Sequence, residues 1–78
     1  MDELFEKLKK VIVDNLDIEA DKVTMEATFR GDLGLDSLDT YELMYSLEAE
    51  TGVKVPDEVA ATFVKVQDVY DYIKKQGN

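Results

Sequence analysis

The chain has 78 residues and a mass of 8.9 kDa, which is the size of one small domain with a modest core. With 18 Asp and Glu residues against 9 Lys and Arg residues, its net charge of −9 disfavours nucleic acids and anionic lipid surfaces as partners. The absence of Cys and His excludes disulfides, thiolate zinc sites, imidazole ligands and most of the nucleophiles and bases that enzymes use.

No apolar run approaches the ~20 residues that span a bilayer, so we expect no membrane insertion. The first residues, Met-Asp-Glu, are acidic where a secretory signal would be basic, which favours a cytoplasmic protein. A single Pro and 45% hydrophobic residues favour a folded helical domain over a disordered acidic chain. We find no repeat or linker that would divide residues 1–78.

The first predicted helix covers residues 2–15. Its apolar residues share one side of a helix, and they are Leu4, Phe5, Leu8, Val11 and Ile12. Residues 16–36 keep no helical or alternating period and predict a long ordered loop with turns at Gly31 and Gly34. Scattered apolar residues indicate that this loop is anchored to the core, namely Ile18, Val23, Met25, Phe29, Leu33 and Leu35.

A second helix is predicted over residues 36–51. Asp36 is placed to cap it, Asp39 stands at the third helical position as in a capping box, and Gly52 is a stop signal. Pro56 fits the first turn of a short third helix over residues 57–61. A fourth helix, predicted to end before Gly77, follows from the helical spacing of Val66, Val69, Tyr70 and Ile73.

The second helix has apolar residues on two sides. One side carries Thr40, Leu43, Met44, Leu47 and Thr51, and the other carries Leu38, Tyr41 and Tyr45 beside the acids Asp39, Glu42 and Glu48. A helix buried on all sides is one interpretation. Because unpaired carboxylates are seldom buried, we favour an exposed apolar patch with an acidic rim, which is typical of a surface that binds a basic partner.

Ser37 stands at the start of the second helix, where a Ser can be a simple first-turn residue. A nucleophilic Ser needs a base, and the chain lacks His, a Gly-x-Ser-x-Gly elbow and a Ser-x-x-Lys motif. We therefore interpret Ser37 as a hydroxyl that another enzyme modifies. Asp36 and Asp39 would oppose a phosphate there by roughly 1 kcal/mol per close charge pair in water, so these acids need a separate role.

Residues 33–40 read Leu-Gly-Leu-Asp-Ser-Leu-Asp-Thr and are followed by Glu-Leu at 42–43 and Leu-Glu at 47–48. This pattern resembles the phosphopantetheine attachment motif of bacterial acyl carrier proteins. The resemblance extends to Thr-Phe at 28–29, Asp-Leu-Gly at 32–34, Val-Pro-Asp-Glu at 55–58 and the closing residues 66–73. It implies one carrier domain over residues 1–78, an all-α four-helix bundle with a long first loop and a short third helix.

The resemblance implies that a holo-acyl-carrier-protein synthase transfers 4'-phosphopantetheine from coenzyme A to the hydroxyl of Ser37 with the help of Mg²⁺. The thiol of the arm would carry growing acyl chains as thioesters in fatty acid biosynthesis, and the protein, a monomer, would not itself be an enzyme. Basic patches on fatty acid or polyketide synthesis enzymes would meet a partner surface made of Asp36, Leu38, Asp39, Tyr41, Glu42, Tyr45 and Glu48.

The resemblance also places the acyl chain between the second and third helices, against Phe29, Leu47, Val55, Ala60, Phe63 and Val69. Some residues depart from the family pattern: Ala49 stands where a second Glu is frequent, Arg30 and Gly31 where apolar or acidic residues are common, and Tyr41 and Tyr45 where aliphatic residues are frequent. These departures leave open a specialised polyketide or lipid carrier. An aminoacyl or D-alanyl carrier and an unmodified acidic interaction module are further alternatives, whereas the chain lacks a calcium-binding loop motif.

Overall fold

The computed structural model describes residues 2–77. Met1 and Asn78, the two termini of the predicted domain, lie outside the described residues. Within that range the chain is all-α, as predicted. It contains α1 (Glu3–Leu16), the short 3₁₀ helix η1 (Ala20–Lys22), α2 (Ser37–Thr51), α3 (Asp57–Ala60) and α4 (Val66–Gly77). None of the described helices is long and apolar enough to cross a bilayer.

Acidic side chains cap the two longest helices. The Asp2 carboxylate accepts a hydrogen bond from the backbone N–H of Leu4 at the start of α1. Asp36 and Asp39 form the predicted capping box at the start of α2. Gly52 ends α2 as predicted, because its φ of 76° lies in the left-handed region that glycine adopts at little cost.

Several predicted boundaries were wrong by one residue, beginning with the first helix, which starts at Glu3 and not at Asp2. Leu16 continues α1 instead of opening the loop, and the loop contains η1. Pro56 precedes α3 as its N-cap because its ψ of 148° is extended, and Ala61 follows α3. α4 continues through Gly77, since a glycine costs a helix only about 1 kcal/mol relative to alanine and does not by itself end the last turn.

The core is one cluster of buried apolar side chains. α1 contributes Leu8, Val11 and Ile12, α2 contributes Leu43, Met44 and Leu47, and α4 contributes Val66, Val69, Tyr70 and Ile73. The first loop adds Val23, Phe29, Leu33 and Leu35, while Ile18 and Met25 are partly buried against the cluster. The predicted anchoring of the loop is therefore confirmed.

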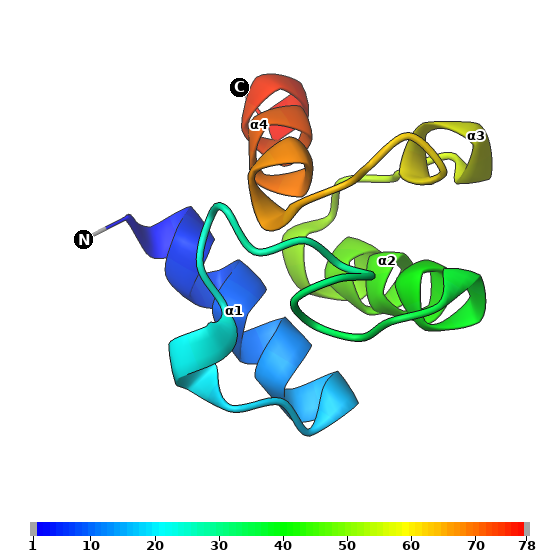
Figure 1. Cartoon of the computed structure of the whole chain (residues 1–78). Coiled ribbons are helices and arrows are strands. Elements are labelled where there is room, and N and C mark those ends of the chain that lie inside the picture. The colour runs from blue at the N-terminus through cyan, green and yellow to red at the C-terminus, as the bar shows by residue number, and fades with distance from the viewer. Residues whose placement is uncertain (1, 78) are drawn as a thin grey trace.

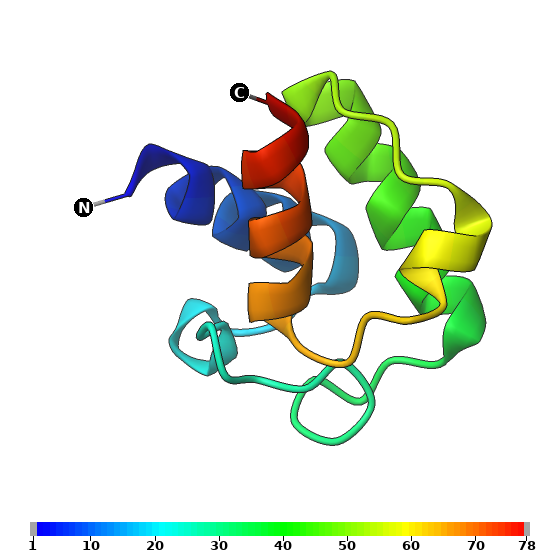
Figure 2. The same ribbon diagram turned by 90° about the horizontal axis from the view of Figure 1, so that it is seen from above.

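Backbone pairing fixes the middle of the first loop against the segment that precedes α4. Thr28 and Lys65 form an isolated antiparallel bridge, and the N–H of Phe29 donates to the carbonyl of Val64 at 3.0 Å. Figure 1 and Figure 2 show this loop crossing the end of the bundle where α4 begins. The sequence did not predict the pairing, because the two segments are far apart along the chain and neither has an alternating pattern. The pairing brings the loop residues near position 30 to the start of α2.

α1 packs against both α2 and α4, and the short α3 packs against α2. The two views show α3 standing beside α2 on the side of the molecule away from α1 (Figure 1, Figure 2). One side of α2 therefore faces the core while another stays outside the helix contacts. This arrangement places Ser37 at the edge of the bundle, where α2 begins.

Candidate functional site

Ser37 is the first residue of α2, and its side chain is exposed. The turn that presents it is held by two carboxylates. Asp36 Oδ1 accepts a hydrogen bond from the N–H of Asp39 at 2.9 Å, and Asp39 Oδ2 accepts one from the N–H of Asp36 at 3.3 Å. Because both carboxylates bind backbone N–H groups, they fix the helix start without covering the hydroxyl between them.

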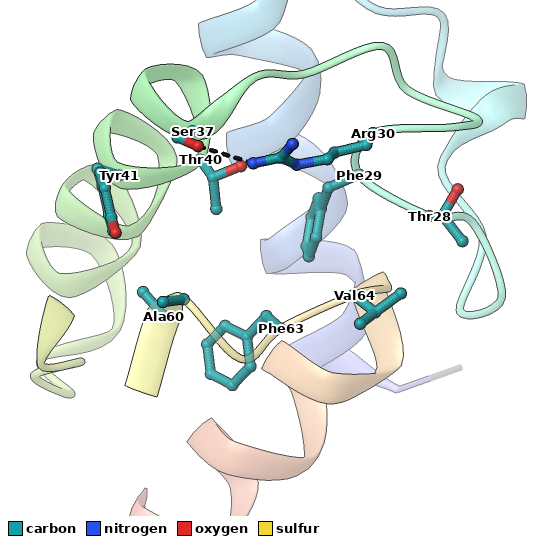
Figure 3. Close-up of a pocket in the computed structure, with 10 residues that line it drawn as sticks. Thr28, Phe29, Arg30, Ser37, Thr40, Tyr41, Ala60, Phe63 and Val64 are labelled. Carbon is teal, nitrogen blue, oxygen red and sulfur yellow. Dashed lines mark hydrogen bonds between the residues drawn. The ribbon is translucent and has the colours of Figure 1, made fainter. Parts of the chain in front are cut away.

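Arg30 contacts this hydroxyl from the first loop. Its Nη2 atom donates a hydrogen bond to Ser37 Oγ at 2.7 Å (Figure 3). Phe29 fixes the backbone beside it, since its N–H donates to Val64 and its carbonyl accepts from the N–H of Leu35 at 2.8 Å. A guanidinium is a hydrogen-bond donor only, so Arg30 orients the Ser37 hydroxyl and cannot act as its base.

A cavity of about 330 Å³ opens beside Ser37. The first loop, the start of α2 and the segment around α3 supply its lining, which consists of Thr28, Phe29, Arg30, Ser37, Thr40, Tyr41, Ala60, Ala61, Phe63 and Val64. Figure 3 shows Ala60 and Phe63 across the cavity from Ser37 and Arg30. A flexible apolar chain held near Ser37 therefore has an apolar recess within reach.

The residues expected to contact an acyl chain fall into two groups. Phe29, Ala60 and Phe63 line the cavity beside Ser37. Leu47, Val55 and Val69 are buried in the core and are not part of that lining. Contact of these six residues with an acyl chain stays a prediction.

Several residues of the cavity lining were not predicted from the sequence. Thr28, Arg30, Thr40, Ala61 and Val64 line it without having been predicted as site residues. The loop pairing brings most of them together, and the sequence gives little sign of that pairing. For Arg30 one signal was available, because it is the only arginine in the chain and lies seven residues from Ser37.

The outward side of α2 is apolar with acidic neighbours. Leu38, Tyr41 and Tyr45 are 66%, 40% and 78% exposed, which excludes a helix buried on all sides. Glu42 between them is exposed as well. We call Leu38, Tyr41, Glu42 and Tyr45 the docking face.

The remaining acids of the predicted partner surface also have contacts inside the chain. Asp36 and Asp39 bind the backbone at the start of α2. Glu48 is half-buried, and its Oε2 atom accepts a hydrogen bond from the N–H of Val55 at 3.4 Å. These three carboxylates therefore support the fold in addition to any contact with a partner.

A second polar contact, away from this site, joins the start of α1 to α4. The Tyr70 hydroxyl on α4 donates a hydrogen bond to the Asp2 carboxylate at the start of α1. This bond is the main reason that the pKa of Asp2 is lowered and the pKa of Tyr70 is raised. Lys74 also donates to the Tyr70 oxygen, at 3.4 Å. The group stabilises the contact between α1 and α4.

The family model described as the phosphopantetheine attachment site matches residues 6–73, a span that contains α2, Ser37 and the whole cavity lining. The acyl carrier protein of Treponema denticola is 54% identical to the chain over 76 residues, which cover 97% of each protein. The chain belongs to the acyl carrier protein family. The acyl carrier protein of Treponema pallidum (strain Nichols) is 47% identical over 76 residues and again covers 97% of each protein.

As a member of this family, the chain carries acyl groups on a covalently attached 4'-phosphopantetheine arm, which confirms the predicted carrier function and cofactor. The residues around Ser37 fit such an arm. The Ser37 hydroxyl is exposed for ester formation, the Arg30 guanidinium lies beside it, and an apolar cavity adjoins it. When bound, the arm supplies a thiol that holds the acyl group as a thioester. Acyl carrier proteins are carriers of substrates and not catalysts.

Proposed function

We propose that Ser37 is the attachment point of 4'-phosphopantetheine, added from coenzyme A by a holo-acyl-carrier-protein synthase. The observation that carries this proposal is the exposed Ser37 hydroxyl at the first residue of α2, fixed by the capping box and beside the cavity. The phosphoanhydride bond of coenzyme A breaks, adenosine 3',5'-bisphosphate leaves, and Ser37 contributes the oxygen that becomes bonded to phosphorus. Its proton must pass to a base of the synthase, because Arg30, its hydrogen-bond partner, is a donor only.

The proposed role is the carriage of growing acyl chains in fatty acid biosynthesis, in the cytoplasm, by a chain with no catalytic activity of its own. Both treponemal relatives bear the name acyl carrier protein, and their similarity extends along 97% of this chain. The lack of His and Cys agrees with a carrier that presents its cargo to enzymes. A carrier dedicated to polyketides or another lipid stays the second candidate, since Tyr41 and Tyr45 make the exposed side of α2 unusually aromatic.

The docking face is the proposed contact with partner enzymes, including the synthase. Exposed aromatic and aliphatic side chains act as anchors at protein interfaces, and an acidic rim accelerates encounter with a basic patch. Leu38, Tyr41 and Tyr45 provide the anchors, and Glu42 provides an acid that makes no capping contact. The net charge of −9 favours the same class of basic partner.

We propose further that the cavity beside Ser37 receives the first part of the acyl chain. Ala60 and Phe63 would contact it there. Longer chains would reach the core residues Leu47, Val55 and Val69 only by separating α2 from α3. The short α3 has a single buried residue, Ala60, so few contacts oppose such a movement.

Loading of the holo protein tests this function. The carrier is incubated with malonyl coenzyme A and a malonyl transferase, and separately with an aminoacyl adenylate and its ligase, and the intact mass is measured. We expect the mass to increase by one malonyl group and not by an aminoacyl group. Hydroxylamine should reverse the increase, because it cleaves thioesters. Aminoacyl loading without acyl loading would overturn the assignment to acyl carriage. A Ser37→Ala protein serves as the unloaded control.

A further inference from the structure

We propose that Arg30 binds the phosphodiester that joins the prosthetic arm to the chain, an inference that rests on attachment at Ser37. Arg30 Nη2 lies 2.7 Å from Ser37 Oγ, the atom that becomes an ester oxygen. The non-bridging oxygens of the phosphodiester are two bonds away from that atom. They therefore lie within reach of the guanidinium that already contacts Oγ (Figure 3).

The Arg30 guanidinium has more N–H donors than its hydrogen bond to Ser37 uses. It carries five N–H groups, and among the described residues its hydrogen bond goes to Ser37 Oγ. The nearby carboxylates are used elsewhere: that of Asp32 accepts from the N–H of Thr28 at 2.9 Å, and those of Asp36 and Asp39 accept each other's N–H. Within residues 2–77 no carboxylate hydrogen-bonds to Arg30 and competes with an incoming phosphate.

Charge favours the same assignment. A phosphodiester at Ser37 lies close to Asp36 and Asp39, and Arg30 is the one charged residue in the lining of the adjoining cavity. Hydrogen bonds from a guanidinium to an anionic phosphate are stronger than those to a neutral hydroxyl, and its planar fork can bind two phosphate oxygens at once. Attachment of the arm therefore replaces a weak acceptor of Arg30 by a strong one.

Arg30 becomes a positioning residue for the root of the arm. Its place is set by the backbone bonds of Phe29 to Val64 and Leu35, so the guanidinium approaches Ser37 from the loop side of the cavity. A phosphate held there is restrained at the point where the arm joins the chain. If the hydrogen bond between Arg30 and Ser37 only joined the first loop to α2, we would expect Arg30 to have no effect on the phosphate.

The ³¹P chemical shift of the fully loaded holo protein tests the proposal. Wild type is compared with Arg30→Gln, which removes the charge, with Arg30→Lys, which keeps it, and with Lys54→Gln. Lys54 is an exposed control that follows the far end of α2, about 20 Å along the helix from Ser37. Spectra are recorded at low salt and in 0.5 M sodium chloride.

At low salt the proposal expects wild type and Lys54→Gln to share one ³¹P shift, Arg30→Gln to be displaced from it, and Arg30→Lys to lie between them. Added salt should move the wild-type signal toward that of Arg30→Gln and leave Arg30→Gln in place. Coincident signals for wild type, Arg30→Lys and Arg30→Gln at low salt would overturn it. Intact mass identifies the loaded fraction beforehand, so a failure of attachment at Ser37, which counts against the proposed function, is distinguished from a missing contact.

Discussion

The carboxylate of Asp36 accepts a hydrogen bond from the backbone N–H of Asp39 at 2.9 Å, and the carboxylate of Asp39 accepts one from the backbone N–H of Asp36 at 3.3 Å. This reciprocal contact fixes the turn on which Ser37 lies. The two acids were predicted both to form this capping box and to contact partner enzymes, and the structure confirms the first of these roles. Glu42, which makes no capping contact, is the better probe of recognition alone.

Removal of the cap at Asp36 should destabilise the fold. Asp36→Ala is expected to lower the free energy of unfolding by about 0.5–2 kcal/mol, because the N–H of Asp39 loses its acceptor. Asp36→Asn keeps an acceptor oxygen and should retain most of that stability. Urea denaturation of the three proteins measures the difference. Equal losses in Asp36→Asn and Asp36→Ala would show that the hydrogen bond is not the source of the effect.

Charge reversal at Glu42 should affect association more than stability. Glu42→Lys is expected to slow modification by the synthase several-fold at low salt and to weaken its salt dependence, because rim charges mainly set encounter rates. Its free energy of unfolding should change by no more than about 0.5 kcal/mol, as is usual for an exposed site. Initial rates measured across a salt series give the result.

Glu50→Lys provides the matched control for Glu42→Lys. It makes the same change of charge on an exposed residue near the end of α2 away from Ser37. The rate for Glu50→Lys should stay closer to that of wild type. A wild-type rate that does not depend on salt would contradict electrostatic steering by the docking face.

The hydrogen bond between Tyr70 and Asp2 should make stability depend on pH at both extremes. The pKa of Asp2 is lowered below its ordinary value of 3.8, so this contribution is present above that pH and is lost as the pH falls through the folded-state pKa. The pKa of Tyr70 is raised above its ordinary value of 10.0, so the contribution is present below pH 10.0 and is lost as the pH rises through the folded-state pKa.

Tyr70→Phe isolates this hydrogen bond, because it keeps the ring and leaves Asp2 to cap α1 through the N–H of Leu4. The variant should melt below wild type at neutral pH, and the gap should narrow in strong acid and in strong base. Thermal melts from about pH 2 to pH 11 measure the gap. A gap of constant size across that range would assign the loss to packing and not to the hydrogen bond.

Acyl chains of increasing length should stabilise the holo protein until the cavity beside Ser37 is filled. Each methylene that becomes buried contributes about 0.8 kcal/mol at most, which corresponds to a rise of several degrees in the melting temperature of a domain of this size. Thermal melts of the carrier loaded with a series of saturated chains give the profile, with the acetyl form as the reference. A flat series would place the acyl chain in solvent and leave Ala60 and Phe63 with a structural role only.

The local features of the fold were readable from the sequence because they depend on neighbouring residues. The capping box of Asp36 and Asp39, the stop at Gly52 and the buried face of α2 each follow from a pattern within one helix. The family was readable as well, since residues 33–40 carry a specific motif. The family comparison confirms that assignment.

Long-range relationships were not readable in the same way. The bridge between Thr28 and Lys65 joins segments that carry no strand pattern, and the place of Arg30 beside Ser37 depends on it. The boundaries of α3 and α4 failed for a different reason. Proline can stand at the first helical position or just before it, and glycine can stand in the last turn or just after it. The residue type therefore does not tell whether Pro56 and Gly77 belong to the helix.

We propose that Ser37 alone carries the prosthetic arm. Intact mass before and after treatment with coenzyme A, Mg²⁺ and a carrier-protein synthase tests it most directly, with Ser46→Ala as the control at the only other serine. Ser46 lies inside α2, where its hydroxyl donates to Asn15 Oδ1 at 3.0 Å. Wild type and Ser46→Ala should each gain one phosphopantetheine, and Ser37→Ala should gain none. A Ser37→Ala protein that gains the same mass would contradict attachment at Ser37.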